Sequence, residues 1–277
     1  MISGKTTLIA HVGYPTESFK APLIYNPWFD SKGIDAVVVP MGVKVEDYPG
    51  FFERLVKLSN IRGMLVTMPH KVTTVGLLDE ASTAVKVAGS CNAVLVRSDG
   101  KVAGDMFDGA GFARGLKRKG FDVKGRSCLI SGTGGVGSAI AASLAADGVA
   151  HMALFDMSKD SAEGLAGRLR EHYPAMKVTT GSNDPAGFDL VVNATPLGMK
   201  PSDPLPFDVS RIGRDTFVGE VVMKQEITPL LKAAQEKGCR TQVGTDMLFE
   251  QIPAYLEFFG FGTTTADELR SVAKVSY

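Results

Sequence analysis

The sequence predicts an α/β protein built from two domains, each with a mostly parallel sheet covered by helices. Its 277 residues exceed the usual size of one domain, and a hydrophobic content of 44% can fill two cores. Apolar runs of strand length alternate with helical segments before residue 104 and again after residue 126. Such alternation favours βαβ units over an all-α or all-β arrangement.

The first alternation follows the order β-α-β-α-β. We expect strands over 6–12, 36–39 and 63–67, and helices over 23–32 and 48–58. In open parallel sheets, ligand-binding groups gather at the carboxyl ends of the strands. The segments 13–18 and 67–71 follow two of these ends, so we expect functional residues there.

The second alternation begins at residue 126, after a connecting helix expected over 105–119. Its strands are expected to end at Ile130, Phe155, Val178, Val192 and Val218. A long amphipathic helix expected over 247–258 would return to the first domain. The predicted domains are therefore 1–104, completed by 245–277, and 105–244. No long polar linker separates them, so we expect a cleft where they meet.

A glycine-rich turn joins the strand that ends at Ile130 to a helix expected over 139–146. The turn consists of Gly132, Thr133, Gly134, Gly135, Val136 and Gly137. The first glycine permits a tight turn, the next lets the backbone approach a pyrophosphate, and the last lets helix and strand pack closely. Amides at the helix N-terminus would bind phosphate, so the second domain is predicted to be a Rossmann domain that binds a dinucleotide.

A carboxylate follows these glycines at the spacing of a dinucleotide site. The strand expected over 151–155 ends at Asp156, which would accept hydrogen bonds from the adenosine ribose hydroxyls. Its charge would repel a 2′-phosphate, so NAD is favoured over NADP, although Lys159 could offset part of the repulsion. A glycine turn followed by an N-capping aspartate would explain each piece separately but not the spacing.

Composition indicates a small-molecule ligand. Thirty basic residues balance thirty acidic ones, so no net field favours nucleic acid or an anionic membrane. A secretory signal pattern and a membrane-length apolar run are both missing, which predicts a cytoplasmic protein. Cys91, Cys128 and Cys239 lack metal-ligand spacing, so we expect buried thiols and no metal site.

Three polar residues are candidates for chemistry. Lys71 follows an apolar strand and Pro69, from where it can reach into a cleft, although lysines in a first helical turn are often simply solvated. Asp105 and Asp108 lie in a glycine-flanked segment at the domain junction. Either carboxylate could instead be a helix cap.

In sequence order, the chain resembles the shikimate dehydrogenase family over nearly its whole length. The family motif V-T-x-P-x-K is similar to residues 66–71, G-x-x-N-T to 89–93 and G-D-N-x-D-G to 104–109. The motif N-A-T matches 193–195, and G-x-x-M-L-x-x-Q matches 244–251. Together with the glycine turn, six ordered motifs carry the resemblance.

The resemblance implies that the first domain binds substrate and that Lys71 and Asp108 form the catalytic pair. The lysine would move the proton of a ring hydroxyl, and the aspartate would orient the lysine. Thr67, Asn92 and Gln251 would bind substrate, and Asn193, Thr195 and Gly244 would lie near the cofactor. The implied enzyme is an NAD(P)-dependent alcohol dehydrogenase for shikimate, quinate or a related cyclic hydroxy compound, acting as a monomer or homodimer.

The loop after the first strand departs from the family. An S-x-S-P segment of the family holds the substrate carboxylate, and its two serine positions are Phe19 and Ala21 in this chain. Thr16 and Ser18 could replace those hydroxyls after a one-residue shift, but such a shift normally turns the opposite face inward. Met223 also replaces a family tyrosine. We therefore hypothesise that the far end of the substrate is recognised differently.

Two other functions stay open from the sequence. A dinucleotide-binding sensor with a decayed substrate pocket would not need both Lys71 and Asp108. A folate-linked dehydrogenase of related architecture fits the Asn92 and Gln251 motifs poorly. Glu17 would suit an amino group or a polyol if it faced the substrate, but a solvent-facing glutamate is the more ordinary expectation.

Overall fold

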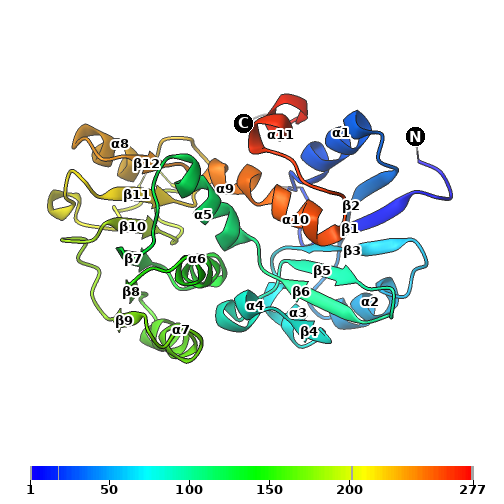
Figure 1. Ribbon diagram of the computed structural model, residues 1–277, viewed down its shortest axis with the longest axis horizontal. Coiled ribbons are helices and arrows are strands. Elements are labelled where there is room, and N and C mark those ends of the chain that lie inside the picture. The colour runs from blue at the N-terminus through cyan, green and yellow to red at the C-terminus, as the bar shows by residue number, and fades with distance from the viewer. Residues whose placement is uncertain (1, 18, 201, 276–277) are drawn as a thin grey trace. The chain divides into compact units, whose positions relative to one another are not determined.

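The protein folds into two compact units, which Figure 1 shows with their elements labelled. The computed structural model describes residues 2–17, 19–200 and 202–275. Unit 1 comprises Met1–Phe107 and Ile252–Tyr277, and unit 2 comprises Asp108–Gln251. Each unit contains one six-stranded sheet, and parallel pairings predominate, which confirms the predicted α/β class.

Unit 1 is built on a sheet with the strand order β2-β1-β3-β5-β6-β4. The strands are β1 (Thr7–Gly13), β2 (Ala36–Gly42), β3 (Ile61–Val66), β4 (Glu80–Ala81), β5 (Ala93–Val96) and β6 (Val102–Asp105). β1 pairs in parallel with β2 and β3, whereas β5 runs antiparallel to β3 and β6. The carboxyl ends of β1, β3 and β6 and the amino end of β5 therefore lie at the same end of the sheet.

Helices cover both faces of this sheet, with α1, α10 and α11 on one side and α2, α3 and α4 on the other in Figure 1. Their bounds are α1 (Pro22–Lys32), α2 (Tyr48–Leu55), α3 (Lys71–Val75), α4 (Thr83–Ala88), α10 (Ile252–Phe259) and α11 (Ala266–Val272). Tyr25 and Phe29, four residues apart on α1, face the same way. Their rings meet those of Tyr255 at 6.5 Å and Phe261 at 5.1 Å between centroids. Aromatic packing thus joins the C-terminal segment of unit 1 to its N-terminal segment.

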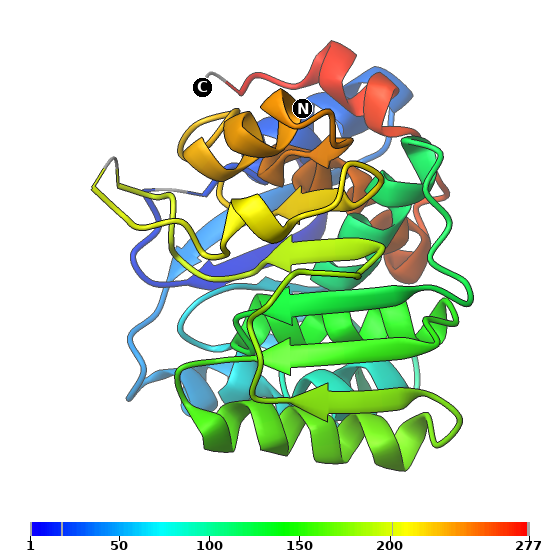
Figure 2. The same cartoon turned by 90° about the vertical axis from the view of Figure 1, so that its left-hand side faces the viewer.

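Unit 2 contains a parallel sheet with the strand order β12-β11-β10-β7-β8-β9. The strands are β7 (Ser127–Ser131), β8 (His151–Phe155), β9 (Lys177–Thr180), β10 (Leu190–Asn193), β11 (Phe217–Glu220) and β12 (Thr241–Gln242). Their arrowheads point the same way in Figure 2. The strand order reverses at β7, and open α/β sheets bind ligands at such a reversal. This arrangement confirms the Rossmann fold predicted for this part of the chain.

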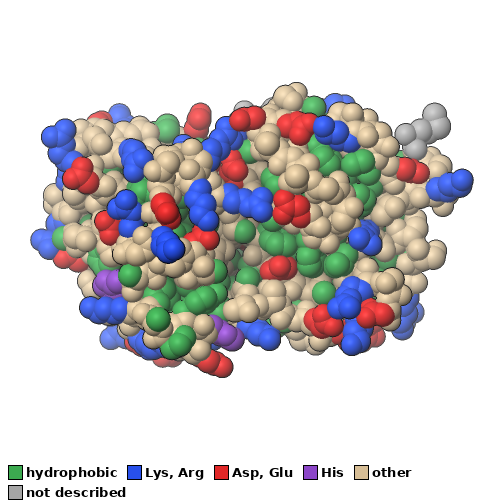
Figure 3. All heavy atoms as spheres, in the orientation of Figure 1, with side chains coloured by type: hydrophobic (Ala, Val, Ile, Leu, Met, Phe, Trp, Pro, Cys, Tyr) green, Lys and Arg blue, Asp and Glu red, His purple; other side chains and the backbone are tan. Residues whose placement is uncertain are grey.

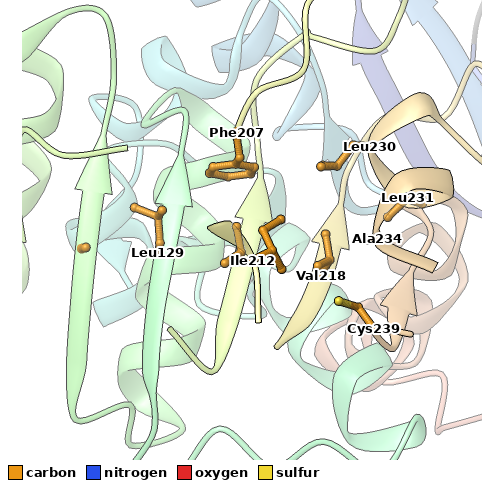
Figure 4. Packing of buried hydrophobic residues seen from close by; sticks show 10 residues of the cluster. Leu129, Phe207, Ile212, Val218, Leu230, Leu231, Ala234 and Cys239 are labelled. Carbon is orange, nitrogen blue, oxygen red and sulfur yellow. The ribbon is translucent and has the colours of Figure 1, made fainter. Parts of the chain in front are cut away.

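Side-chain alternation divides the core of unit 2 between the two faces of its sheet. The helices are α5 (Asp108–Arg118), α6 (Gly135–Ala146), α7 (Lys159–His172), α8 (Pro229–Glu236) and α9 (Gly244–Glu250), with a short 3-10 helix at Val209–Arg211. On one face, Leu129 and Val218 pack with Leu231 of α8 in the cluster that Figure 4 shows. On the other face, Gly219 lies against the ring of Phe112 of α5.

The expectation of a single helix over 247–258 is wrong, because the chain forms two helices there, α9 and α10, with Gln251 between them. Pro253 accounts for the break, since it has no amide hydrogen and its ring conflicts with the carbonyl of Phe249, four residues earlier. The helix expected from residue 105 begins instead at Asp108, because Asp105 pairs with Ala93 as the last residue of β6.

The unit boundaries fall at 107/108 and 251/252, whereas the sequence pattern places the domain boundaries at 104/105 and 244/245. The second boundary falls at 251/252 instead of 244/245 because α9 packs on α5. A Cβ built on Gly111 of α5 would lie 2.6 Å from the carbonyl oxygen of Met247 and 2.7 Å from Cβ of Gln251. This close packing keeps α9 in unit 2.

Charges of both signs are interspersed over the face seen in Figure 3, in keeping with the balanced composition. Within the described ranges, none of the helices combines the length and the apolar character needed to cross a bilayer.

Replacing Leu231 with alanine is expected to lower the free energy of unfolding by about 2–5 kcal/mol, because the side chain is 0% exposed and its loss leaves a cavity. Urea unfolding followed by circular dichroism measures the change. Leu205, which is 43% exposed, provides the control, and its replacement with alanine should cost less than about 0.5 kcal/mol. Equal losses for the two variants would contradict the assignment of the cluster in Figure 4 as a stabilising core.

Candidate active site

The candidate substrate residues of unit 1 are held where β1 and β3 end. The amide of Thr67 donates a hydrogen bond of 2.9 Å to the carbonyl of Val12, which extends the β1–β3 pairing. The amide of Cys91 donates to the carbonyl of Lys71 at 2.8 Å, and Asn92 follows Cys91 directly. Backbone hydrogen bonds therefore bring Thr67, Lys71 and Asn92 to the same end of the sheet, although they are separate in the sequence.

Asn92 is 1% exposed and holds the segment that leads into unit 2. Its Oδ1 accepts a hydrogen bond of 2.9 Å from the amide of Phe107, and its backbone carbonyl accepts one of 3.2 Å from the hydroxyl of Tyr255. Asp108 is the residue after Phe107, and consecutive Cα atoms are about 3.8 Å apart. The backbone of Asp108 therefore lies beside the Asn92–Phe107 hydrogen bond. The side chain of Asn92 thus fixes the backbone in front of one predicted catalytic residue.

The loop after β1 shows where the substituted positions lie. The methyl group of Thr16 packs against the end of β2, since its Cγ2 would lie 3.2 Å from a Cβ built on Gly42. Glu17 is exposed, as the ordinary expectation has it, and Ser18 lies outside the described residues. Ala21 occupies the N-cap of α1 and offers no side-chain hydrogen bond there. Substrate binding by Thr16 and Ser18 stays a prediction.

Phe19 contacts a residue that the sequence reasoning missed. Its ring stacks on the imidazole of His11 with 4.1 Å between the centroids and 28° between the planes. His11 is 9% exposed, and within the described residues its buried Nδ1 has no hydrogen-bond partner. Burial, together with the charge of Lys71, lowers the pKa of His11 to about 4, so the ring is neutral near pH 7. A histidine inside an otherwise apolar strand was the signal available in the sequence.

The glycine turn of unit 2 leaves a space bordered by backbone. Gly132 has φ +94°, and a Cβ on it would lie 2.7 Å from the carbonyl of Ala194. A Cβ on Gly137 would lie 1.9 Å from the carbonyl oxygen of Gly132, so α6 packs directly on the turn. In contrast, apart from the chain neighbours and the backbone of α6, no atom of the described residues lies within 4 Å of a Cβ built on Gly134 or Gly135. The turn therefore has the tight inner packing and the open outer side that a bound phosphate requires, at the N-terminus of a twelve-residue helix.

Thr133 and Asp156 meet beside this turn. Oδ2 of Asp156 accepts hydrogen bonds from the amide of Thr133 at 2.7 Å and from its hydroxyl at 3.0 Å, and Oδ1 accepts one from the amide of Ser158 at 2.9 Å. Desolvation acts to raise the pKa of Asp156, but the hydrogen bonds from Thr133 and Ser158 lower it overall. The carboxylate is therefore ionised and fixed in direction. Val136 lies in the first turn of α6, three residues after Thr133.

Asn193 organises the neighbouring loop from inside the protein. Its Oδ1 accepts hydrogen bonds from the amide of Thr195 at 3.1 Å and the hydroxyl of Thr195 at 2.6 Å, and its Nδ2 donates to Glu220 at 2.9 Å. Burial raises the pKa of Glu220, although hydrogen bonds from Thr228 and Asn193 act against this rise. Sequence reasoning missed Glu220, whose role depends on tertiary contacts. The network fixes the loop whose Ala194 lies against Gly132.

Asp108 and Gln251 are the first and last residues of unit 2, and both are buried. Asp108 begins α5, Gln251 follows α9, and these two helices pack together. Among the described residues, Oε1 of Gln251 has no hydrogen-bond partner. Lys71 and Asn92 belong to unit 1, so the residues expected to bind and convert substrate are divided between the units.

Gly244 and Met223 are placed by a close backbone contact. A Cβ on Gly244 would lie 2.2 Å from the carbonyl oxygen of Val222, which precedes the half-buried Met223.

Elsewhere, Cys91, Cys128 and Cys239 are free and buried. The described part of the chain contains no group of three or more His, Cys, Asp or Glu side chains suited to a metal ion.

These features define a class of protein: a two-unit α/β dehydrogenase with a glycine turn at the reversal of a parallel sheet and a lysine at the end of a second sheet. A family model for the shikimate dehydrogenase substrate binding domain matches residues 12–94. A shikimate dehydrogenase (NADP(+)) of Rubrobacter xylanophilus is 32% identical over 257 residues, which cover 90% of this chain and 89% of the relative. The chain belongs to the shikimate dehydrogenase family, and it is an oxidoreductase.

Solved structures agree with this assignment. A shikimate 5-dehydrogenase from Listeria monocytogenes, in complex with shikimate and NAD, has a TM-score of 0.91 and 28% identity, and the match covers 98% of this chain and 97% of the other. The ligand-free 5-ketofructose reductase of a Gluconobacter strain has a TM-score of 0.88 and 25% identity, with 98% of both chains covered.

Acidification is expected to destabilise the protein through His11. Its folded-state pKa of about 4 lies below the ordinary 6.5, so the unfolded chain takes up the proton first. The stabilising contribution is complete above pH 6.5 and is lost as the pH falls towards 4. Between about pH 7 and about pH 5, urea unfolding should show a loss of stability that is about 2 kcal/mol larger in the wild type than in His11→Leu, because His70 and His151, whose pKa values are also lowered, contribute equally to both proteins. His172→Leu, at the end of α7, should keep the wild-type loss; the same pH response in all three proteins would refute the role of His11.

Proposed function

We propose that this chain transfers a hydride between NAD(P) and a ring alcohol of shikimate, quinate or a related cyclic hydroxy compound. The observation that carries the proposal is the set Thr67, Lys71 and Asn92, fixed by backbone hydrogen bonds at one end of the unit 1 sheet. The Listeria relative was solved with shikimate and NAD, which supports the same reaction class for this chain.

Oxidation of an alcohol requires that its hydroxyl proton leave as the hydride departs. NAD(P), when bound, accepts that hydride. Nζ of Lys71 would hold the proton of the reacting hydroxyl and stabilise the developing alkoxide, while Asp108 would orient Lys71. Thr67, Asn92 and Gln251 would bind further hydroxyls, and the unpaired Oε1 of Gln251 supports its assignment because a hydroxyl can donate to it.

The cofactor is proposed to bind at the glycine turn of unit 2. Amides of Gly134, Gly135 and Val136 at the start of α6 would hold the pyrophosphate, and Asp156 would accept from the ribose hydroxyls. The loop held by Asn193, with Thr195, would lie beside the cofactor, and Gly244 would adjoin it. NAD is proposed as the preferred cofactor, because the ionised Asp156 would repel a 2′-phosphate. The named relatives include an NADP enzyme and an NAD complex.

A substrate without a carboxylate belongs in the proposed range. Phe19 and Ala21 offer no hydroxyl where the family motif has two, and Glu17 is exposed. The structurally similar Gluconobacter enzyme is a reductase of 5-ketofructose, an uncharged sugar, so the fold is compatible with such a substrate. The sensor and folate-linked alternatives are not favoured by the comparisons.

Lys71→Ala is expected to lower turnover by about 10²- to 10⁴-fold, because the proton acceptor is lost, while dinucleotide affinity stays nearly unchanged. Initial rates of NAD and NADP reduction with shikimate, quinate and cyclic polyols measure turnover, and nucleotide fluorescence titration measures affinity. Lys86→Ala, an exposed lysine of α4, is the matched control. Wild-type turnover by Lys71→Ala would remove Lys71 from the mechanism.

Asp156→Ser is expected to shift the ratio of the NADP and NAD dissociation constants by about tenfold towards NADP, because one repelling charge is removed. Fluorescence titration with each cofactor measures the ratio. Asp160→Ser, an exposed aspartate in the first turn of α7, should leave it unchanged. An unaltered ratio in Asp156→Ser would show that this carboxylate does not discriminate between the cofactors.

A further inference from the structure

The stacked pair of His11 and Phe19 joins β1 to the loop that follows it, in which Phe19 stands where the family motif would have its first serine. His11 is paired with Leu65 in the β1–β3 register, and Phe19 covers the imidazole from the loop that precedes α1. A Cβ built on Gly13 would lie 2.8 Å from Cζ of Phe19 and 2.4 Å from Cγ2 of Thr67. The aromatic ring therefore lies directly beside a residue proposed to contact substrate.

Lys71 is the charged group that acts on His11. Its positive charge is one of the two influences that keep the imidazole unprotonated, the other being burial. The pair thus borders Thr67 and lies within electrostatic reach of the proposed catalytic lysine, all within unit 1. No rearrangement of the two units is needed to bring these four side chains to the same region.

Nδ1 of His11 is a buried polar atom without a hydrogen-bond partner among the described residues. Buried polar atoms in folded proteins are nearly always paired, so an exception calls for a specific cause. Other such atoms occur among the described residues, on Asn183 and Gln242 for example, but that of His11 lies at the end of a sheet where the proposed substrate-binding residues gather. The unused hydrogen-bonding capacity of this imidazole makes the ring a candidate partner for a ligand hydroxyl.

The chemistry of the pair favours one class of ligand. A neutral imidazole has one donor and one acceptor, and a hydroxyl group can satisfy either, whichever tautomer is present. A carboxylate only accepts and requires several donors or a positive charge when it is buried. Phe19 and Ala21 have replaced the two donors of the family motif with apolar groups. The end of β1 is therefore suited to an uncharged, hydroxylated group with an apolar face.

We propose that His11 and Phe19 form the recognition site for the part of the substrate remote from the reacting carbon, and that they select an uncharged polyhydroxy alcohol or ketone over a hydroxy acid. His11 would hydrogen-bond a substrate hydroxyl, and Phe19 would pack against carbon atoms of the substrate. The inference rests on the proposed hydride transfer and specifies the class of its substrate.

The test compares two groups of substrates in wild type, His11→Leu and the double variant Phe19→Ser/Ala21→Ser. Shikimate and quinate are the acids, myo-inositol and 5-ketofructose are the uncharged probes, and both cofactors are used in the matching redox state. We expect the wild type to favour an uncharged probe by at least about tenfold in kcat/KM. His11→Leu should lose about 10- to 100-fold on that probe, mainly through KM, and the double variant should gain about tenfold on shikimate.

Matched controls separate recognition from folding. His172→Leu in unit 2 should retain wild-type kinetics on every probe. Circular dichroism and dinucleotide titration verify that each variant is folded. If His11→Leu does not fold, Phe19→Leu replaces it as the test variant: it removes the aromatic face and should lower kcat/KM on the uncharged probe by about tenfold while leaving kcat/KM on shikimate unchanged.

The outcomes distinguish the two proposals. A wild type that prefers shikimate, with His11→Leu unaffected, overturns the role of the pair and leaves the proposed hydride transfer standing. Dinucleotide binding without turnover of any probe overturns the proposed function. In that case, calorimetry measures binding of the same probes and tests the recognition site of His11 and Phe19 independently of turnover. Binding of an uncharged probe that is lost in His11→Leu supports the recognition site, whereas binding by neither uncharged probe overturns it.

Discussion

The parallel pairing of β1 with β3 determines where the candidate substrate residues of unit 1 lie. The register joins His11 to Leu65 and Val12 to Val66, and the next hydrogen bond, from Thr67 to Val12, extends it beyond the strands. Side chains alternate between the two faces, so a slip of one residue would turn His11 away from Phe19. The positions of Thr67 and Lys71 follow from the same ladder, because both lie within a few residues of its end.

Two buried polar groups illustrate how this protein treats polarity in its interior. Glu220 is fully enclosed, but Asn193 and Thr228 donate to its carboxyl group, and the network makes the loop after β10 rigid. His11 is almost as deeply buried, yet its Nδ1 has no such partner among the described residues. Glu220, whose hydrogen bonds are satisfied, stabilises the scaffold. His11 keeps hydrogen-bonding capacity that a ligand can use.

Much of the fold followed from periodicity and glycine spacing. The turn at Gly132 and the carboxylate at Asp156 identified the Rossmann unit, because both features are local in sequence. The break between α9 and α10 does not show in the apolar pattern, which continues past Gln251, and Pro253 is its one local signal in this segment. The strand β4 has only two residues, too few for a pattern. His11 looked like part of a core strand, because stacking on Phe19 and the reach of Lys71 exist only in three dimensions.

Unit 2 is one uninterrupted segment, whereas unit 1 is assembled from two segments on either side of it. A ribosome therefore delivers every residue of the nucleotide unit before it delivers α10, whose Tyr255 donates to the carbonyl of Asn92 and packs on Tyr25. Until this segment emerges, Tyr25 and Phe29 of α1 lack their contacts with the rings of Tyr255 and Phe261. The order of synthesis thus makes unit 1 the last to be completed, although most of its residues are made first.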